Sequence, residues 1–135
     1  MPINFFPRMG QVLMADFSDL KEPEMTKIRP VIIVSPRLPY RSELAAVVPV
    51  SLTPPRHNLP FCYRLSKNYN PLEHDSLPCW AKADMVTNIA IRRLEGFKVG
   101  RRKWDYPSLS PADLDAVRLA VMFGLGLDRL KIGAP

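Results

Sequence analysis

The chain has 135 residues, enough for one domain over residues 1–135 and too few for a second core. Nineteen basic residues against 13 acidic ones give a formal charge of +6, which suits a polyanionic partner such as nucleic acid. No apolar run is long enough to span a bilayer and no signal-peptide pattern begins the chain, so we expect a cytoplasmic protein.

Most of the chain is predicted to form short strands, because 15 prolines favour short strands and rigid loops over long helices. Alternating or β-branched patterns predict strands over 11–17, 30–35, 44–50, 61–65 and 79–86, with a strand or turn over 87–94. One helix is predicted after the N-cap Ser110, with Pro111 at its first position. The predicted fold class is therefore mainly β, a small barrel-like sheet with a C-terminal helix against it.

Arg29 is the candidate on which the functional reading depends. It stands next to Pro30, which with Pro36 brackets the β-branched run over 31–34 as an end marker. A guanidinium held at the start of a rigid strand can offer its planar fork to a phosphate with little rotamer entropy left to lose. The alternative is a surface arginine that caps the strand.

Other polar residues stand at strand ends or in nearby loops. Glu24 and Lys27 lie in the loop before Arg29, Ser51 and Thr53 end the third strand, and Lys82 and Asp84 end a later one. Each also has an ordinary structural explanation: a solvated loop carboxylate, turn hydroxyls, or a strand-end ion pair.

Further basic residues are candidates for binding RNA. Arg92 and Arg93 follow a predicted strand, and Arg101 and Arg102 lie beside an aromatic residue that could stack on a base; a solvated loop is the alternative. Trp80 is expected in the core or at a dimer contact. His57 and His74 lie in unrelated loops, which argues against a pair of catalytic imidazoles.

Taken in order, four features resemble the MazF/PemK family of toxins from toxin–antitoxin pairs. They are Glu24, KIRPVIIVS at 27–35, VVPVS at 47–51 and WAKAD at 80–84. The resemblance covers about residues 9–127 and leaves 1–8 and 128–135 as terminal extensions. It implies an antiparallel SH3-like barrel of the MazF/CcdB type and a homodimer. It also implies a metal- and cofactor-independent endoribonuclease that acts on single-stranded RNA, with mRNA the expected target, and a cognate antitoxin that blocks the site.

Carried over by position, Arg29 matches the family's arginine, and Ser51 matches a strand-end hydroxyl that is more commonly threonine. Lys82 and Asp84 resemble an Arg-x-Asp pair with lysine in place of arginine. Phe61 falls where some members have an aromatic residue contacting RNA. The residues expected to bind RNA are Lys27, Thr53, Phe61, Arg92, Arg93, Arg101 and Arg102.

RNA can be cut without metal when its own 2′-hydroxyl attacks the neighbouring phosphate, which calls for a base, an acid and cations. We expect Arg29 to stabilise the phosphorane, Asp84 or alternatively Glu24 to take the 2′-hydroxyl proton, Ser51 to hold a phosphate oxygen, and Lys82 to add positive charge. The products would carry 2′,3′-cyclic phosphate and 5′-hydroxyl ends.

Two other readings remain open at this stage. One is a gyrase-poisoning toxin of the CcdB type, against which the chain's last residues, IGAP at 132–135, count because that group ends in Trp-Gly-Ile. The other is a catalytically silent barrel that binds RNA or a protein, because Ser51 and Lys82 replace more usual groups.

Overall fold

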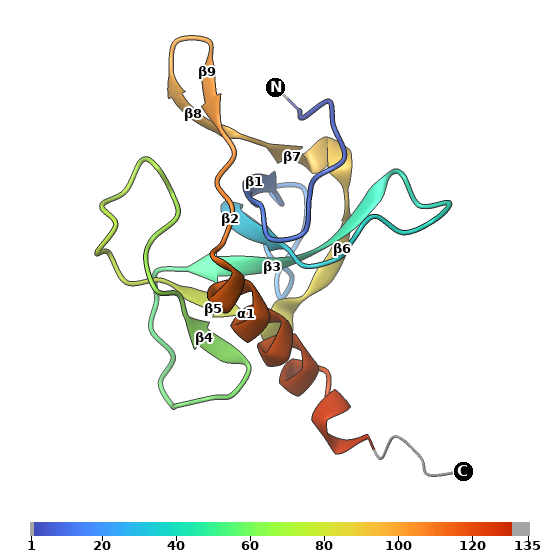
Figure 1. The fold of residues 1–135 in the computed structure, drawn as a ribbon, viewed down its shortest axis with the longest axis vertical. Coiled ribbons are helices and arrows are strands. Elements are labelled where there is room, and N and C mark those ends of the chain that lie inside the picture. Colours follow the sequence, from blue (N-terminus) through green and yellow to red (C-terminus); the bar gives the residue numbers. More distant parts are fainter. Residues whose placement is uncertain (1, 131–135) are drawn as a thin grey trace.

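The structure, a computed structural model, describes residues 2–130, so the C-terminal residues 131–135 lie outside it. Seven strands form one antiparallel sheet in the hydrogen-bonded order β4-β5-β3-β2-β1-β7, with β6 also paired to β3 (Figure 1). Their bounds are β1 Val12–Asp16, β2 Ile28–Ile33, β3 Leu44–Ser51, β4 Cys62–Arg64, β5 Trp80–Lys82, β6 Thr87–Ala90 and β7 Leu94–Glu95.

The mainly β class with one C-terminal helix is confirmed, whereas the predicted barrel does not close. Within residues 2–130 the path of paired strands starts at β4 and ends at β7, and no hydrogen-bonded pairing joins these two edges. The fold is an open, bent sheet. Strands β4 and β7 have three and two residues, so neither edge offers the length of ladder that closure needs.

Strand β2 starts at Ile28, two residues earlier than predicted, so Arg29 lies inside the strand and Pro30 does not mark its end. Pro30 is tolerated because β2 has only β1 as a partner at this point: Pro30 lies opposite Met14, and pairing with β3 begins at Val31. A proline interrupts a ladder only where its missing N–H is needed.

The two faces of the sheet carry separate cores, as the two-residue period of a strand requires. One core includes Ile32 and Val48, and the other includes Val31 and Val47. Arg29 and Ser51 have the parity of the second pair, so both belong to the face of the second core.

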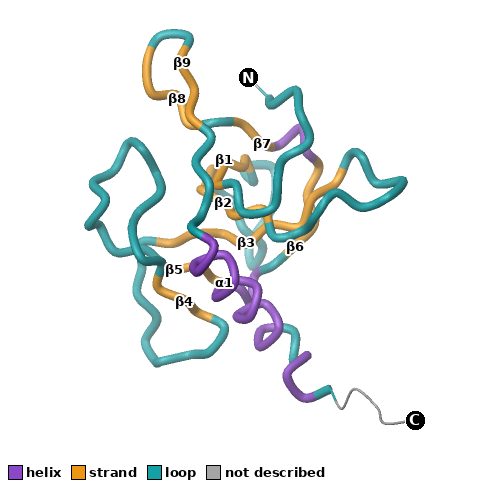
Figure 2. Tube along the Cα trace, viewed as in Figure 1, coloured by secondary structure: helices purple, strands orange, loops and turns teal. Residues whose placement is uncertain are grey.

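Helix α1, Pro111–Gly124, covers the face of the first core, where it contributes Val117 and Ala120 (Figure 2). The predicted N-cap is confirmed: the Ser110 side chain accepts a hydrogen bond from the backbone N–H of Asp113. No helix in the described part of the chain is long and apolar enough to cross a membrane.

Three short 3-10 turns follow strands or the helix: η1 Ala83–Met85, η2 Ile91–Arg93 and η3 Leu127–Arg129. The strand predicted over 79–86 is therefore wrong in its second half, where η1 replaces it. Strands β8 Phe97–Gly100 and β9 Lys103–Asp105 form a separate hairpin that was not predicted and that projects from the body (Figure 1).

Candidate active site

Strands β2 and β3 bring Arg29 and Ser51 to the same place. Val31 pairs with Pro49, and continuing this register by two residues sets Arg29 opposite Ser51. The β2–β3 ladder itself ends at Val31 and Pro49, and the side chains of Arg29 and Ser51, just beyond this end, line the same cavity. Residues that are 22 positions apart in the sequence therefore meet at the end of one sheet face.

The next strand along the sheet supplies Lys82 and Asp84. Strands β5 and β6 both pair with β3, and η1 lies between them in the sequence. Pairing with β3 is therefore interrupted between Val47 and Val50. Lys82 stays in β5 on the face that carries Ser51, because Ser51 pairs with Trp80, two residues before Lys82. Asp84 leaves the sheet within η1 and is exposed. The interruption gives the carboxylate a position that a regular strand would not.

A cavity of about 730 Å³ opens at this point. Its walls come from the loop before β2 and from β2, β3, β5 and η1. All five residues predicted to be catalytic line it, as does Lys27. The lining residues are Glu22, Pro23, Glu24, Met25, Thr26, Lys27, Arg29, Pro49, Ser51, Lys82, Asp84 and Met85.

The guanidinium of Arg29 has unused hydrogen-bonding capacity in this cavity. Its Nε is buried and has no hydrogen-bond partner in the described part of the chain. Buried donors are nearly always paired, so an orphaned one needs an explanation. An anion bound in the cavity would provide the missing acceptor.

Ser51, Lys82 and Asp84 are also available to bind a ligand. The Oγ of Ser51 accepts a hydrogen bond from the backbone N–H of Thr53 at 3.1 Å, which leaves its own O–H free to donate. No salt bridge joins Lys82 to Asp84 within residues 2–130, so the strand-end ion pair considered from the sequence does not form.

Comparison with known proteins identifies the family. The profile of the PemK-like, MazF-like toxins of type II toxin–antitoxin systems matches residues 8–124. The chain belongs to this family. A comparison with curated proteins found no match.

Solved structures show the same fold as this toxin-family chain. MazF from Deinococcus radiodurans aligns with a TM-score of 0.64 and 22% identity, over 91% of this chain and 99% of that one. An endoribonuclease in complex with its cognate antitoxin, from Mycobacterial species, aligns with a TM-score of 0.61 and 21% identity, over 90% and 96%. Toxin MazF-mt6 of Mycobacterium tuberculosis gives 0.55 and 19%, over 85% and 95%.

The other RNA-binding candidates of this toxin lie outside the cavity wall, and their roles stay predictions. Thr53 is exposed just beyond Ser51, and Phe61 is half-buried directly before β4. Arg101 and Arg102 are at the tip of the β8–β9 hairpin, which Figure 1 shows at the opposite end of the molecule from the last turn of α1.

Arg92 and Arg93 line a different hollow, of about 380 Å³. Arg93 is engaged within the protein: its two terminal nitrogens bind the carboxylate of Asp19, with the Nη2–Oδ2 distance 2.9 Å, and Nη1 also donates to the carbonyl of Asp16. The hydrogen bond from Arg93 lowers the pKa of Asp19. Arg93 thus ties the loop before β2 to η2.

The histidines take no part in the cavity. The Nδ1 of His74 lies 2.7 Å from Ser76 Oγ in the loop after β4, and His57 is exposed in the loop before it. The sequence-based argument against a pair of catalytic imidazoles therefore agrees with where the structure places them.

Asp113 is a buried carboxylate in the first turn of α1. It is 1% exposed and accepts hydrogen bonds from the hydroxyls of Tyr63, Ser66 and Tyr69, at 2.6 to 2.7 Å. Burial alone would raise its pKa, but these hydrogen bonds outweigh burial and hold the pKa below its ordinary value. The network joins α1 to β4 and to the loop that follows it.

Proposed function

We propose that this protein is a metal-independent endoribonuclease that cuts single-stranded RNA, with mRNA as its expected target, as the toxin of a toxin–antitoxin pair. One observation carries the proposal. The five residues expected to be catalytic, from four separate parts of the chain, line one cavity together with a buried, unpaired guanidinium nitrogen.

Arg29 and Lys82 are the cations of the proposed reaction. The phosphate of the scissile linkage lies against Arg29, whose orphaned Nε and terminal nitrogens stabilise the extra negative charge of the phosphorane. Lys82 adds a second positive charge from the neighbouring strand. The O–H of Ser51 donates to a non-bridging oxygen and fixes the orientation of the phosphate.

The covalent step needs no water or metal. A carboxylate takes the proton of the 2′-hydroxyl, the 2′-oxygen forms a bond to phosphorus, and the bond from phosphorus to the 5′-oxygen breaks. The departing 5′-oxygen accepts a proton from the Arg29 guanidinium, and the proton taken up by the carboxylate is later returned to Arg29, so the products end in a 2′,3′-cyclic phosphate and a 5′-hydroxyl. Asp84 is our choice for the base because η1 turns it out of the sheet into the cavity; Glu24, on the loop wall, is the competing carboxylate.

The partners follow from the family. A cognate antitoxin would inhibit the enzyme by covering the cavity, and one structural neighbour is itself in complex with its cognate antitoxin. We further propose a homodimer in the cytoplasm, which the resemblance implies.

The proposal is tested by incubating the purified protein with a long single-stranded RNA in EDTA and mapping the cuts. Discrete cuts are expected from the wild-type protein and none from a folded Arg29→Ala variant. Arg118→Ala, which removes an exposed arginine from the outer face of α1, is the matched control and should cut at the wild-type rate. Intact RNA with the wild-type protein, or full activity in Arg29→Ala, would contradict the assignment.

A further inference from the structure

Trp80 and Arg64 continue the row of residues that begins at Ser51. Ser51 pairs with Trp80 across β3 and β5, and Trp80 pairs with Arg64 across β5 and β4. Paired residues share a face of the sheet. The three side chains therefore lie in line on the face that also carries Arg29 and Lys82, opposite the face that α1 covers.

This row is not used by the core. Trp80 is half-buried and packs against neither core cluster, so the expectation of a core residue is wrong, whereas the alternative of a dimer contact stays a prediction. The side chains on the other face of the same strands, Tyr63 and Ala81, do pack with the first core and α1. An indole left on an open sheet face has a flat apolar surface available for a ligand.

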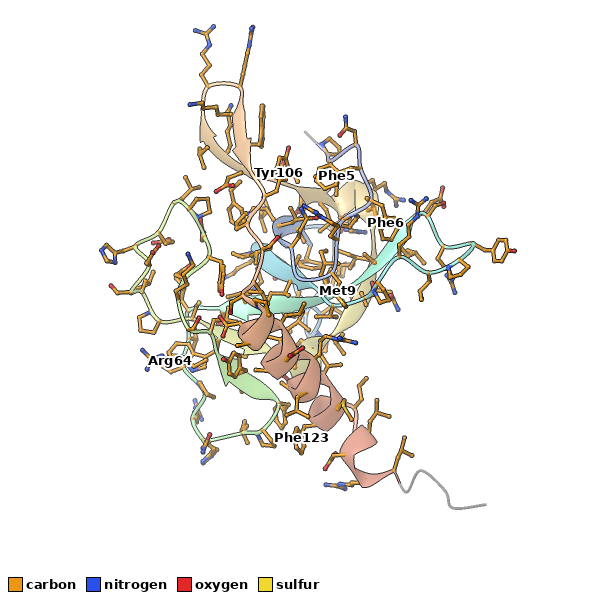
Figure 3. The ribbon with its side chains drawn as sticks, viewed as in Figure 1. Phe5, Phe6, Met9, Arg64, Tyr106 and Phe123 are labelled. Atoms are coloured by element: carbon orange, nitrogen blue, oxygen red, sulfur yellow. The ribbon has the colours of Figure 1, made fainter. Side chains whose placement is uncertain are left out.

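Arg64 adds a charge at the outer end of the row. It is exposed on β4, the edge strand of the sheet (Figure 3). Neighbouring cross-strand positions are about 5 Å apart at Cβ, so the row steps outward from Ser51 by one indole and then by one guanidinium. An aromatic surface followed by a cation is the combination with which proteins hold a base and the adjoining phosphate of a single strand.

We propose that Trp80 stacks on the base next to the scissile phosphate of a single-stranded nucleic acid, and that Arg64 binds the following phosphate. The inference rests on the proposed function only in that Ser51 marks the position of the scissile phosphate. Stacking tolerates any base, so this subsite supplies affinity and register more than sequence selection.

The test uses the fluorescence of Trp80. The chain has two tryptophans, so a Trp104→Phe background leaves Trp80 as the only one. The probe is a single-stranded DNA of mixed sequence, which lacks the 2′-hydroxyl and stays intact whether or not the proposed chemistry is correct. We expect a saturable change in emission on binding. Because Trp80→Ala and Trp80→Phe remove the last tryptophan of this background, their affinities are measured by the anisotropy of a dye-labelled copy of the same DNA. Trp80→Ala should weaken binding roughly tenfold, whereas Trp80→Phe keeps most of it.

Arg64 is tested by its salt dependence. Arg64→Gln should lower the slope of log affinity against log salt by about 0.7, the value for one phosphate contact on a single strand. With cleavable RNA, Trp80→Ala should raise KM and leave kcat near the wild-type value, because the indole touches no reacting atom. If the wild-type protein fails to cut RNA, the DNA titration still decides this proposal separately.

Three results would overturn it. The first is unchanged Trp80 emission together with unchanged affinity in Trp80→Ala. The second is an emission change that depends on protein concentration without nucleic acid, which would show that a second copy covers the indole. The third is an equal response to polyglutamate, which would show that the row recognises acidic peptides.

Discussion

At the scale of single residues, Asp113 shows how one buried carboxylate stabilises the wall behind the site. Three hydroxyls donate to it, so replacing it with asparagine leaves donors facing an amide that can accept fewer of them. We expect Asp113→Asn to lower the free energy of unfolding by about 3 kcal/mol. Urea titration measures this, and Asp115→Asn, an exposed carboxylate on the same helix, is the control. Equal stability of the two variants would contradict the role of the network.

The same network predicts a pH dependence of stability. Because the pKa of Asp113 is lowered in the folded protein, its contribution is complete above about pH 4 and is lost as the pH falls through the folded-state pKa. The hydrogen bond to Asp113 raises the pKa of Tyr63 from 10.0 to about 12, so that contribution is lost as the pH rises from 10 to 12. Unfolding free energies measured across pH should fall more at both ends for the wild-type protein than for Asp113→Asn.

At the scale of elements, the end of α1 positions η1 and hence Asp84. A Cβ at Gly124 would lie 3.1 Å from the Ala83 carbonyl oxygen and 3.1 Å from the Cα and N of Asp84. Gly124 is helical and has no positive φ, unlike Gly126, so close packing explains this glycine better than helix termination does. A methyl group here must push η1 away by a few tenths of an ångström.

Gly124→Ala should therefore reduce kcat on the order of tenfold while KM and the melting temperature change little, because alanine also favours the helix. Steady-state cleavage of RNA measures both constants. Gly100→Ala is the matched control, since the added methyl would meet Lys103 at an ordinary 3.6 Å. Unchanged kcat in Gly124→Ala would mean either that η1 adapts without moving the carboxylate or that Asp84 is not the base.

The strands and turns around the site also show which parts of it could be predicted from the sequence and which could not. The proximity of Arg29 to Ser51 could be expected from the sequence, because the β-branched runs indicate where the two strands that carry these residues begin and end. The position of Asp84 does not, because nothing in WAKAD distinguishes a strand from a strand that breaks into a 3-10 turn. The partners of Asp113 lie 44 to 50 residues away, beyond any local pattern. The β8–β9 hairpin was missed because its strands have only four and three residues, too few for an alternating pattern to be recognised.

At the scale of the whole molecule, the charge of +6 is spread between the cavity and distant elements. The β8–β9 hairpin holds Arg101 and Arg102 away from the cavity wall, so they would act on affinity and not on chemistry. Replacing both with glutamine should lower the salt slope of RNA binding by about 1.4 and leave kcat unchanged. A filter-binding series over salt concentration checks this, and an unchanged slope would assign both arginines to a solvated loop.

The central claim is that the cavity around Arg29 promotes attack by the substrate's own 2′-hydroxyl. The most direct measurement compares, in EDTA, an RNA containing a mapped cut site with the same RNA carrying one 2′-deoxynucleotide immediately 5′ to that cut. We predict cleavage of the first, with 2′,3′-cyclic phosphate and 5′-hydroxyl ends, and no cleavage of the second at that site. Cleavage of the deoxy-substituted RNA at the same position and rate would contradict the account.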